Sequence, residues 1–184
     1  MTAGAALATD DATWDTFVAE GRPGSYLQMA GWARVKAVNG WRSTRIGSDA
    51  VAAQILIRRP RPLPWAFAYA PRGPVTPDWT ADTVAQFSEA VRRDLRERAG
   101  RVSHLRIDPE IERDAGPDEG GALRRALKAA GWRPATPIQP NATRVIDLAA
   151  DEEALWGDLR KKWRQYVNKA RNALACPVFA SVIS

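Results

Sequence analysis

The sequence predicts an α/β fold in which helices flank one mixed central sheet. In some stretches apolar residues recur at three- and four-residue steps, and in others they alternate, so helical and strand segments follow one another along the chain. Clusters of proline and glycine separate these segments. The length of 184 residues, with 45% hydrophobic and 26% charged residues, suits one compact globular domain.

The first part of the chain is expected to form two helices and three strands. The predicted elements are, in order, a helix capped at Thr9 or Asp10, a helix over 28–38, strands over 42–46 and 51–58, a loop over 59–64 and a strand over 65–69. The first helix should bury Trp14, Phe17 and Val18. The loop contains three prolines, which lack the N–H that a central strand must donate.

The second part continues the alternation. The predicted elements are a helix over 80–98, a strand over 102–107, a polar loop over 114–121, a helix over 122–130, a strand over 143–148 and a last helix from Glu152 to Arg171. His104, the only histidine, lies within a strand and is expected to pack in the core. The last helix should begin after an Asp151 cap and be continuous, with an apolar stripe that includes Leu159 and Trp163.

The net charge of +6 is unevenly distributed. In the last predicted helix, Arg160, Arg164 and Arg171 are expected to lie together beside the apolar stripe. Such a row suits a polyanion such as tRNA or a nucleotide diphosphate. The alternative is a solvated basic face without a ligand.

Several classes of protein are excluded by what the sequence lacks. Cys176 is the only cysteine, and no Cys/His cluster has metal-ligand spacing, so neither a disulfide framework nor a metal site is expected. No phosphate-binding glycine loop and no dinucleotide fingerprint occurs, and no cofactor is expected. The acidic first 20 residues do not resemble a signal peptide, and no apolar run is long enough for a membrane span. We therefore expect a cytoplasmic protein.

Three positions are candidates for a functional site. Lys36, near the end of a predicted helix, could reach a phosphate or simply solvate the helix end. Arg72 lies in a rigid Pro/Gly turn after a strand, where it could bind a carboxylate or phosphate or pair with a local carboxylate. Asp108 ends a strand before Pro109, and could accept a proton, cap the turn or pair with Arg106.

Three segments, in order along the chain, resemble the first half of the FemABX family, the aminoacyl transferases that build peptidoglycan cross-bridges. These segments are Trp32-Ala33-Arg34-Val35-Lys36, Tyr69-Ala70-Pro71-Arg72-Gly73-Pro74 and Leu105-Arg106-Ile107-Asp108-Pro109. The resemblance implies a sheet similar to the N-acetyltransferase fold in residues 1–174, the first of two tandem domains. It also implies that Lys36, Tyr69 and Arg72 bind substrate, and that Asp108 acts as the base for the attacking amine.

The function implied by the resemblance is transfer of an amino acid from aminoacyl-tRNA to the stem-peptide amine of a UDP-linked or lipid-linked peptidoglycan precursor. Peripheral contact with the inner face of the membrane would suit a lipid-linked acceptor. Residues 175–184 depart from the family pattern, and we expect an atypical or truncated tail. Two alternatives stay open: a non-catalytic domain that binds sugar nucleotides or tRNA, and an acyl-CoA-dependent N-acyltransferase with an unusual phosphate loop.

Overall fold

The computed structural model describes residues 10–21, 24–110, 119–140 and 149–174. The chain divides into two compact units, residues 1–141 and 142–184, and each is described by itself. The predicted strand over 143–148 lies outside the described residues. The predicted bounds of a single domain, residues 1–174, stay a prediction.

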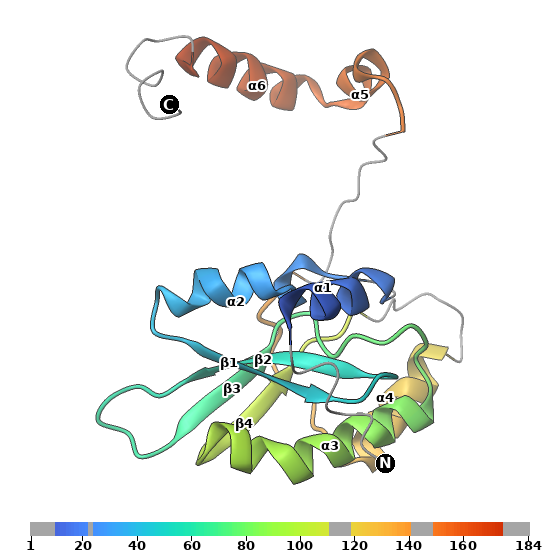
Figure 1. Ribbon diagram of the computed structural model, residues 1–184. Coiled ribbons are helices and arrows are strands. Elements are labelled where there is room, and N and C mark those ends of the chain that lie inside the picture. Colours follow the sequence, from blue (N-terminus) through green and yellow to red (C-terminus); the bar gives the residue numbers. More distant parts are fainter. Residues whose placement is uncertain (1–9, 22–23, 111–118, 141–148, 175–184) are drawn as a thin grey trace. The chain divides into compact units, whose positions relative to one another are not determined.

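The first unit is built on a four-stranded mixed sheet, as predicted (Figure 1). The strands are β1 (Arg42–Gly47), β2 (Ala52–Arg58), β3 (Ala66–Ala70) and β4 (Val102–Ile107), and they lie in this order in the sheet. β1 and β2 form an antiparallel hairpin, β2 and β3 are antiparallel, and β3 and β4 are parallel. The carboxyl ends of β3 and β4 therefore lie side by side.

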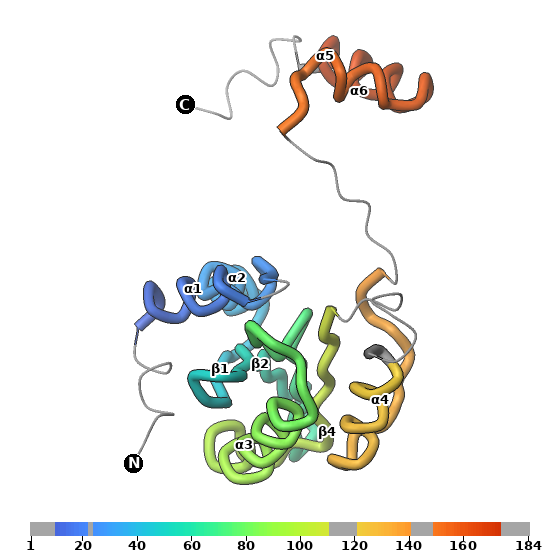
Figure 2. The backbone as a smooth tube through the Cα atoms, turned by 90° about the vertical axis from the view of Figure 1, so that its right-hand side faces the viewer, coloured from blue at the N-terminus to red at the C-terminus, as the bar shows by residue number. Residues whose placement is uncertain are grey.

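Helix α3 (Ala81–Ala99) connects the two parallel strands and covers one face of the sheet (Figures 1 and 2). Its buried residues Val84 and Phe87 lie on the apolar stripe that the sequence predicts, and Phe87 belongs to the same hydrophobic core as Ile55 and Ala68 of the sheet. Helix α4 (Glu119–Ala129) packs on α3. It begins within the region predicted as the polar loop over 114–121, so that prediction was wrong for its last residues.

The opposite face of β1 and β2 is covered by α1 (Asp11–Glu20), a 3-10 turn η2 (Tyr26–Gln28) and α2 (Ala30–Ala37). Asp10 caps α1 by accepting hydrogen bonds from the backbone N–H and hydroxyl of Thr13, as one of the two predicted caps. The sequence predicts one helix over residues 28–38, and the observed helix α2 begins two residues later than that, at Ala30. Met29 is extended, and the N–H of Ala30 donates to the Asp15 carboxylate at 2.7 Å, which fixes the start of α2.

The prediction of a core position for His104 was wrong, because the ring is exposed. The pairing of β3 with β4 shifts register between Ala66 and Ala68: Ala66 pairs with Val102, and Ala68 pairs with Leu105. Val102 and Leu105 both face the core, although they are three residues apart rather than two. A bulge adds a residue and breaks the alternation of a strand. It leaves both Ser103 and His104 outside the core.

The second unit contains two helices where the sequence predicts one. α5 (Glu152–Asp158) is capped by Asp151, as predicted, and α6 (Lys161–Leu174) follows. Leu159 has an extended backbone, and the carbonyl of Arg160 accepts the first hydrogen bonds of α6. The continuous apolar stripe from α5 into α6 is therefore interrupted at Leu159. No helix in the described part of the chain has the length and apolar character of a membrane span.

Candidate functional site

The carboxyl ends of β3 and β4 bring together Tyr69 and Asp108, two of the predicted site residues. The hydroxyl of Tyr69 donates a hydrogen bond of 3.3 Å to Oδ2 of Asp108. The N–H of Asp108 donates to the carbonyl of Gly73 at 3.1 Å, so the turn after β3 holds the residue after β4. Both side chains are half-buried. Crevices at the carboxyl ends of parallel strands are where α/β proteins usually bind ligands.

Tyr69 is held in its protonated form. Burial raises the pKa of Tyr69 above its ordinary value. A hydrogen bond from Gln139 opposes this rise, and the negative charge of Asp108 adds to it. Nε2 of Gln139 donates to the phenol oxygen at 3.3 Å, which leaves the phenol proton directed at Asp108. At neutral pH the pair is therefore a neutral phenol beside a carboxyl group. A carboxylate held in this way can accept a proton from an amine.

Arg72 lies next to this pair, but its guanidinium group already has partners. Its Nε is 3.1 Å from Oε1 of Glu110, and its Nη2 donates to the carbonyl of Pro140 at 3.1 Å. The side chain is only 15% exposed. The alternative that Arg72 pairs with a local carboxylate therefore describes this structure. Its backbone φ of 54° is in the left-handed region, where a residue other than glycine is strained.

The side chain of Gln28 holds the turn that carries Arg72, a role that the sequence did not indicate. The Gln28 side chain is fully buried. Its Nε2 donates to the carbonyls of Pro71 and Gln54, and its Oε1 accepts from the N–H of Gln54 at 2.8 Å. A Cβ at Gly73 would lie 2.8 Å from this amide, so the position requires glycine.

Gln28, Glu110 and Gln139 are the residues of this site that sequence reasoning missed. Each acts through a partner distant in the sequence, so no local pattern indicated its role. The only signal was polar Gln28 at the start of an otherwise apolar helical pattern.

Lys36 lies on α2, with its ammonium group 4.8 Å from the ring centroid of Trp32. The Trp32 ring also contacts Tyr26 edge to face. Within the described residues, Trp32 Nε1 is buried without an acceptor, so packing rather than a hydrogen bond holds the indole. In the same part of the chain, no hydrogen bond or ion pair joins Lys36 to Tyr69, Arg72 or Asp108. Of the four predicted residues, Tyr69 and Asp108 are therefore hydrogen-bonded to each other. Arg72 lies on the turn whose Gly73 carbonyl accepts from the N–H of Asp108, and within the described residues Lys36 is not connected to the other three.

The three arginines predicted to form a row lie around the break between α5 and α6. Arg160 lies between the helices, so the prediction of one row on one helix was wrong. Arg164 donates to the carbonyls of Trp156 and Gly157, at the end of α5. Arg171 pairs with Glu152 at 3.5 Å and lies over the ring of Trp156. Two of the three therefore tie α6 to α5, and their binding to a polyanion stays a prediction.

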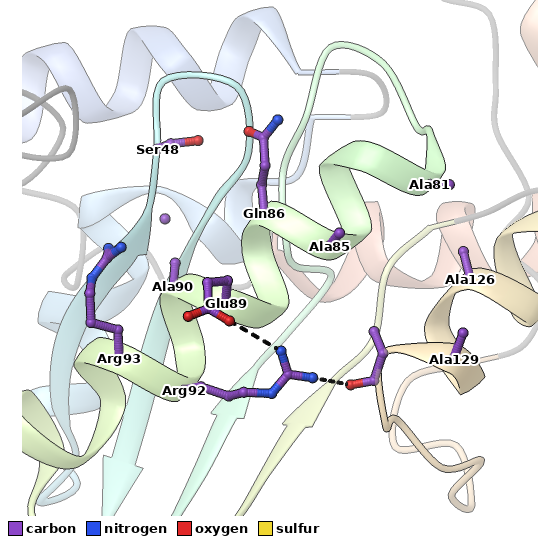
Figure 3. A pocket seen from close by; sticks show the side chains of 12 residues that line it. Ser48, Ala81, Ala85, Gln86, Glu89, Ala90, Arg92, Arg93, Ala126 and Ala129 are labelled. Carbon is purple, nitrogen blue, oxygen red and sulfur yellow. Dashed lines mark hydrogen bonds and ion pairs between the residues drawn. The ribbon is translucent and has the colours of Figure 1, made fainter.

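A hollow of about 790 Å³ lies on the side of α3, and its lining includes neither Tyr69 nor Asp108 (Figure 3). Alanines of α3 and α4 form much of its wall. Arg92 bridges it, pairing with Glu89 at 3.4 Å and donating to the carbonyl of Ala130 at 2.6 Å. No described group of three or more His, Cys, Asp and Glu side chains is arranged to hold a metal ion. The pair at the strand ends therefore remains the candidate site.

The family model of the FemAB family matches residues 9–173, almost the whole chain. The chain belongs to the FemAB family. It is 30% identical over 169 residues to the lipid II:glycine glycyltransferase of Staphylococcus saprophyticus, covering 87% of this chain and 40% of the relative. The enzyme of the same name from Staphylococcus aureus is 27% identical, with 85% and 39% covered. This FemAB chain thus spans about 40% of the length of these curated relatives.

The fold is similar to that in the crystal structure of FemX, with a TM-score of 0.61 and 23% sequence identity. The match covers 87% of this chain and 42% of FemX, which is consistent with one domain of a larger protein. The likeness to the N-acetyltransferase fold stays a prediction.

Proposed function

We propose that this FemAB chain takes part in the transfer of an amino acid to the stem-peptide amine of a peptidoglycan precursor, as the part that binds the acceptor. The observation that carries the proposal is the Tyr69–Asp108 pair at the adjoining ends of two parallel strands. It supplies a half-buried proton acceptor beside a neutral phenol, which is what an attacking amine needs. The names of the staphylococcal relatives, lipid II:glycine glycyltransferases, support the same chemistry.

In the proposed reaction, Asp108 holds the neutral side-chain amine of the stem peptide and takes up one of its protons as the nitrogen attacks. The nitrogen forms an amide bond with the carbonyl carbon of an aminoacyl-tRNA ester. The ester C–O bond breaks, and the proton passes to the released 3′ oxygen of the tRNA. Tyr69 orients the carboxylate through its hydrogen bond. Holding the two reactants in line supplies much of the rate enhancement of such a reaction.

Lys36 is the proposed contact for the diphosphate of the precursor. Its ammonium group is a flexible point charge near the end of α2, and it lies over the Trp32 ring at 4.8 Å from the ring centroid. Arg72 would support this site by holding the turn after β3 through Glu110, instead of binding the substrate itself. A cytoplasmic location would give access to both UDP-linked and lipid-linked precursors.

The test is calorimetric titration of the 184-residue chain with a UDP-linked muropeptide. Lys36→Ala should weaken binding by roughly tenfold, because a charge-assisted contact to phosphate is lost. Lys128→Ala removes one exposed charge from α4 and is the matched control, which should bind as the wild type does. Equal affinities for all three proteins would contradict the role of Lys36. Binding of coenzyme A in preference to the muropeptide would instead favour an acyl-CoA-dependent N-acyltransferase.

A further inference from the structure

Gln139 lies in the segment that follows α4, and this segment is held at both ends. Residues 133–138 are exposed and belong to no helix or strand. Before them, Nε1 of Trp132 donates a hydrogen bond of 2.8 Å to a serine of α3. After them, the carbonyl of Pro140 accepts a hydrogen bond of 3.1 Å from Nη2 of Arg72. The position of the half-buried Gln139 is therefore fixed by contacts on both sides of it.

The hydroxyl of Tyr69 has two hydrogen-bonding neighbours. Oδ2 of Asp108 and Nε2 of Gln139 each lie 3.3 Å from the phenol oxygen. A phenol has one proton to donate, a carboxylate can only accept, and an amide nitrogen can only donate. Both contacts are satisfied when Gln139 donates to the phenol oxygen and the phenol donates to Asp108. The amide of Gln139 thus opposes the other orientation of the phenol proton, which would point at the amide nitrogen.

This direction of the phenol proton determines which oxygen of Asp108 is in use. Oδ2 accepts from Tyr69, whereas among the described residues Oδ1 has no hydrogen-bond partner. The other charged group that acts on the phenol is Arg72, which is paired with Glu110 and does not bind Asp108 in the described structure. The half-buried Asp108 therefore keeps one oxygen available at the carboxyl ends of the parallel strands.

We propose that Gln139 is a positioning residue, which directs the phenol proton of Tyr69 to Oδ2 of Asp108 and so leaves Oδ1 to receive the acceptor amine. The binding of the amine rests on the function proposed above, whereas the direction of the proton does not. Gln139 acts on the amine only through Tyr69 and Asp108, so its loss should weaken the recognition of the amine without abolishing it.

The first test is ¹⁹F NMR of the 184-residue chain in which 3-fluorotyrosine replaces the three tyrosines. The Tyr69 resonance is the one that is missing from Tyr69→Phe. Gln139→Leu should raise the pKa of Tyr69 further, because a hydrogen bond that lowers it is lost. If Gln139 only packed the segment in place, its loss would open the site to water and lower this pKa instead.

Two more variants make this titration sharper. Gln139→Glu keeps the size of the side chain but sets a second carboxylate beside the phenol, so it should raise the pKa of Tyr69 more than Gln139→Leu does. Thr136→Val alters an exposed position of the same segment and is the matched control, which should titrate as the wild type does.

The second test is calorimetric titration with a UDP-linked muropeptide whose side-chain amine is free or acetylated. Acetylation should weaken binding to the wild type by roughly tenfold, and binding to Gln139→Leu by only roughly threefold, because Asp108 is then less well oriented. An acetylation effect that is as large in Gln139→Leu as in the wild type would overturn the proposal, as would an unchanged or lowered pKa of Tyr69 in that variant.

The two tests separate this proposal from the proposed function. If the pKa of Tyr69 rises in Gln139→Leu and none of the proteins binds the muropeptide, the positioning of the phenol proton by Gln139 stands and the proposed function fails. If the wild type discriminates between the free and the acetylated amine while the pKa of Tyr69 is unchanged in Gln139→Leu, the proposed function stands and the role of Gln139 fails.

Discussion

At the scale of single residues, the candidate site depends on the protonation of one phenol. The raised pKa of Tyr69 means that the folded chain holds this proton more tightly than the unfolded chain does. This contribution to stability is therefore fully present below about pH 10, the ordinary pKa of tyrosine. It is lost as the pH rises through the higher pKa of the folded state.

Tyr69→Phe should remove the tyrosine that ionises last in an alkaline titration. The chain has three tyrosines, and their ionisation is followed by ultraviolet absorbance. In the wild type, one of the three should titrate above the ordinary range, because Tyr69 is half-buried beside Asp108. Tyr26→Phe is the control, since Tyr26 is 67% exposed and its loss should leave that late phase in place. A late phase that persists in Tyr69→Phe would contradict this assignment.

Gln28 is expected to contribute to the stability of the fold through its buried hydrogen bonds. Gln28→Leu leaves the N–H of Gln54 and the carbonyl of Pro71 without their buried partner. An unsatisfied buried group costs about 1–3 kcal/mol, so we expect a loss of about 2–4 kcal/mol in urea unfolding. Gln86→Leu on the exposed face of α3 is the control and should change the free energy of unfolding by less than about 0.5 kcal/mol. Similar losses in both variants would show that Gln28 has no special role.

The sequence could predict Asp108 as a candidate because its position after a strand and before a proline is a local feature. It could not predict Gln28 or Gln139, because their partners are 43 and 70 residues away in the chain. A polar side chain with distant partners is indistinguishable in sequence from one that faces solvent.

At the scale of elements, the strongly periodic segments were the predictable ones. β2 is a largely apolar run that Gln54 interrupts, and α3 has a clear apolar stripe; both lie within one residue of the predicted bounds. The break between α5 and α6 was missed because neither Leu159 nor Arg160 is a residue that ends helices by itself. The hydrogen bonds of Arg164 to the last carbonyls of α5 stabilise that break, and they are contacts between two helices.

The packing of α3 with the segment after α4 gives a prediction at this scale. Nε1 of Trp132 donates to the Ser88 hydroxyl at 2.8 Å, and the Trp132 ring stacks on Phe87. Ser88→Ala removes the acceptor and should lower the free energy of unfolding by about 1–2 kcal/mol. Ser43→Ala, at an exposed position of β1, is the comparison and should have a smaller effect in the same urea titration. If Ser88→Ala has no effect, this hydrogen bond does not hold Trp132 in place.

At the scale of the whole molecule, the proposed acceptor amine lies at the carboxyl ends of β3 and β4, beside the hydrogen-bonded side chains of Tyr69 and Asp108.

The most direct test of the central claim is a double-mutant cycle on the acceptor amine. The wild-type chain and Asp108→Asn are each titrated by calorimetry with a UDP-linked muropeptide whose side-chain amine is either free or acetylated. If Asp108 binds this amine, acetylation should weaken binding to the wild type by roughly tenfold and leave binding to Asp108→Asn almost unchanged. If acetylation has the same effect on both proteins, Asp108 does not contact the amine, and the claim is contradicted.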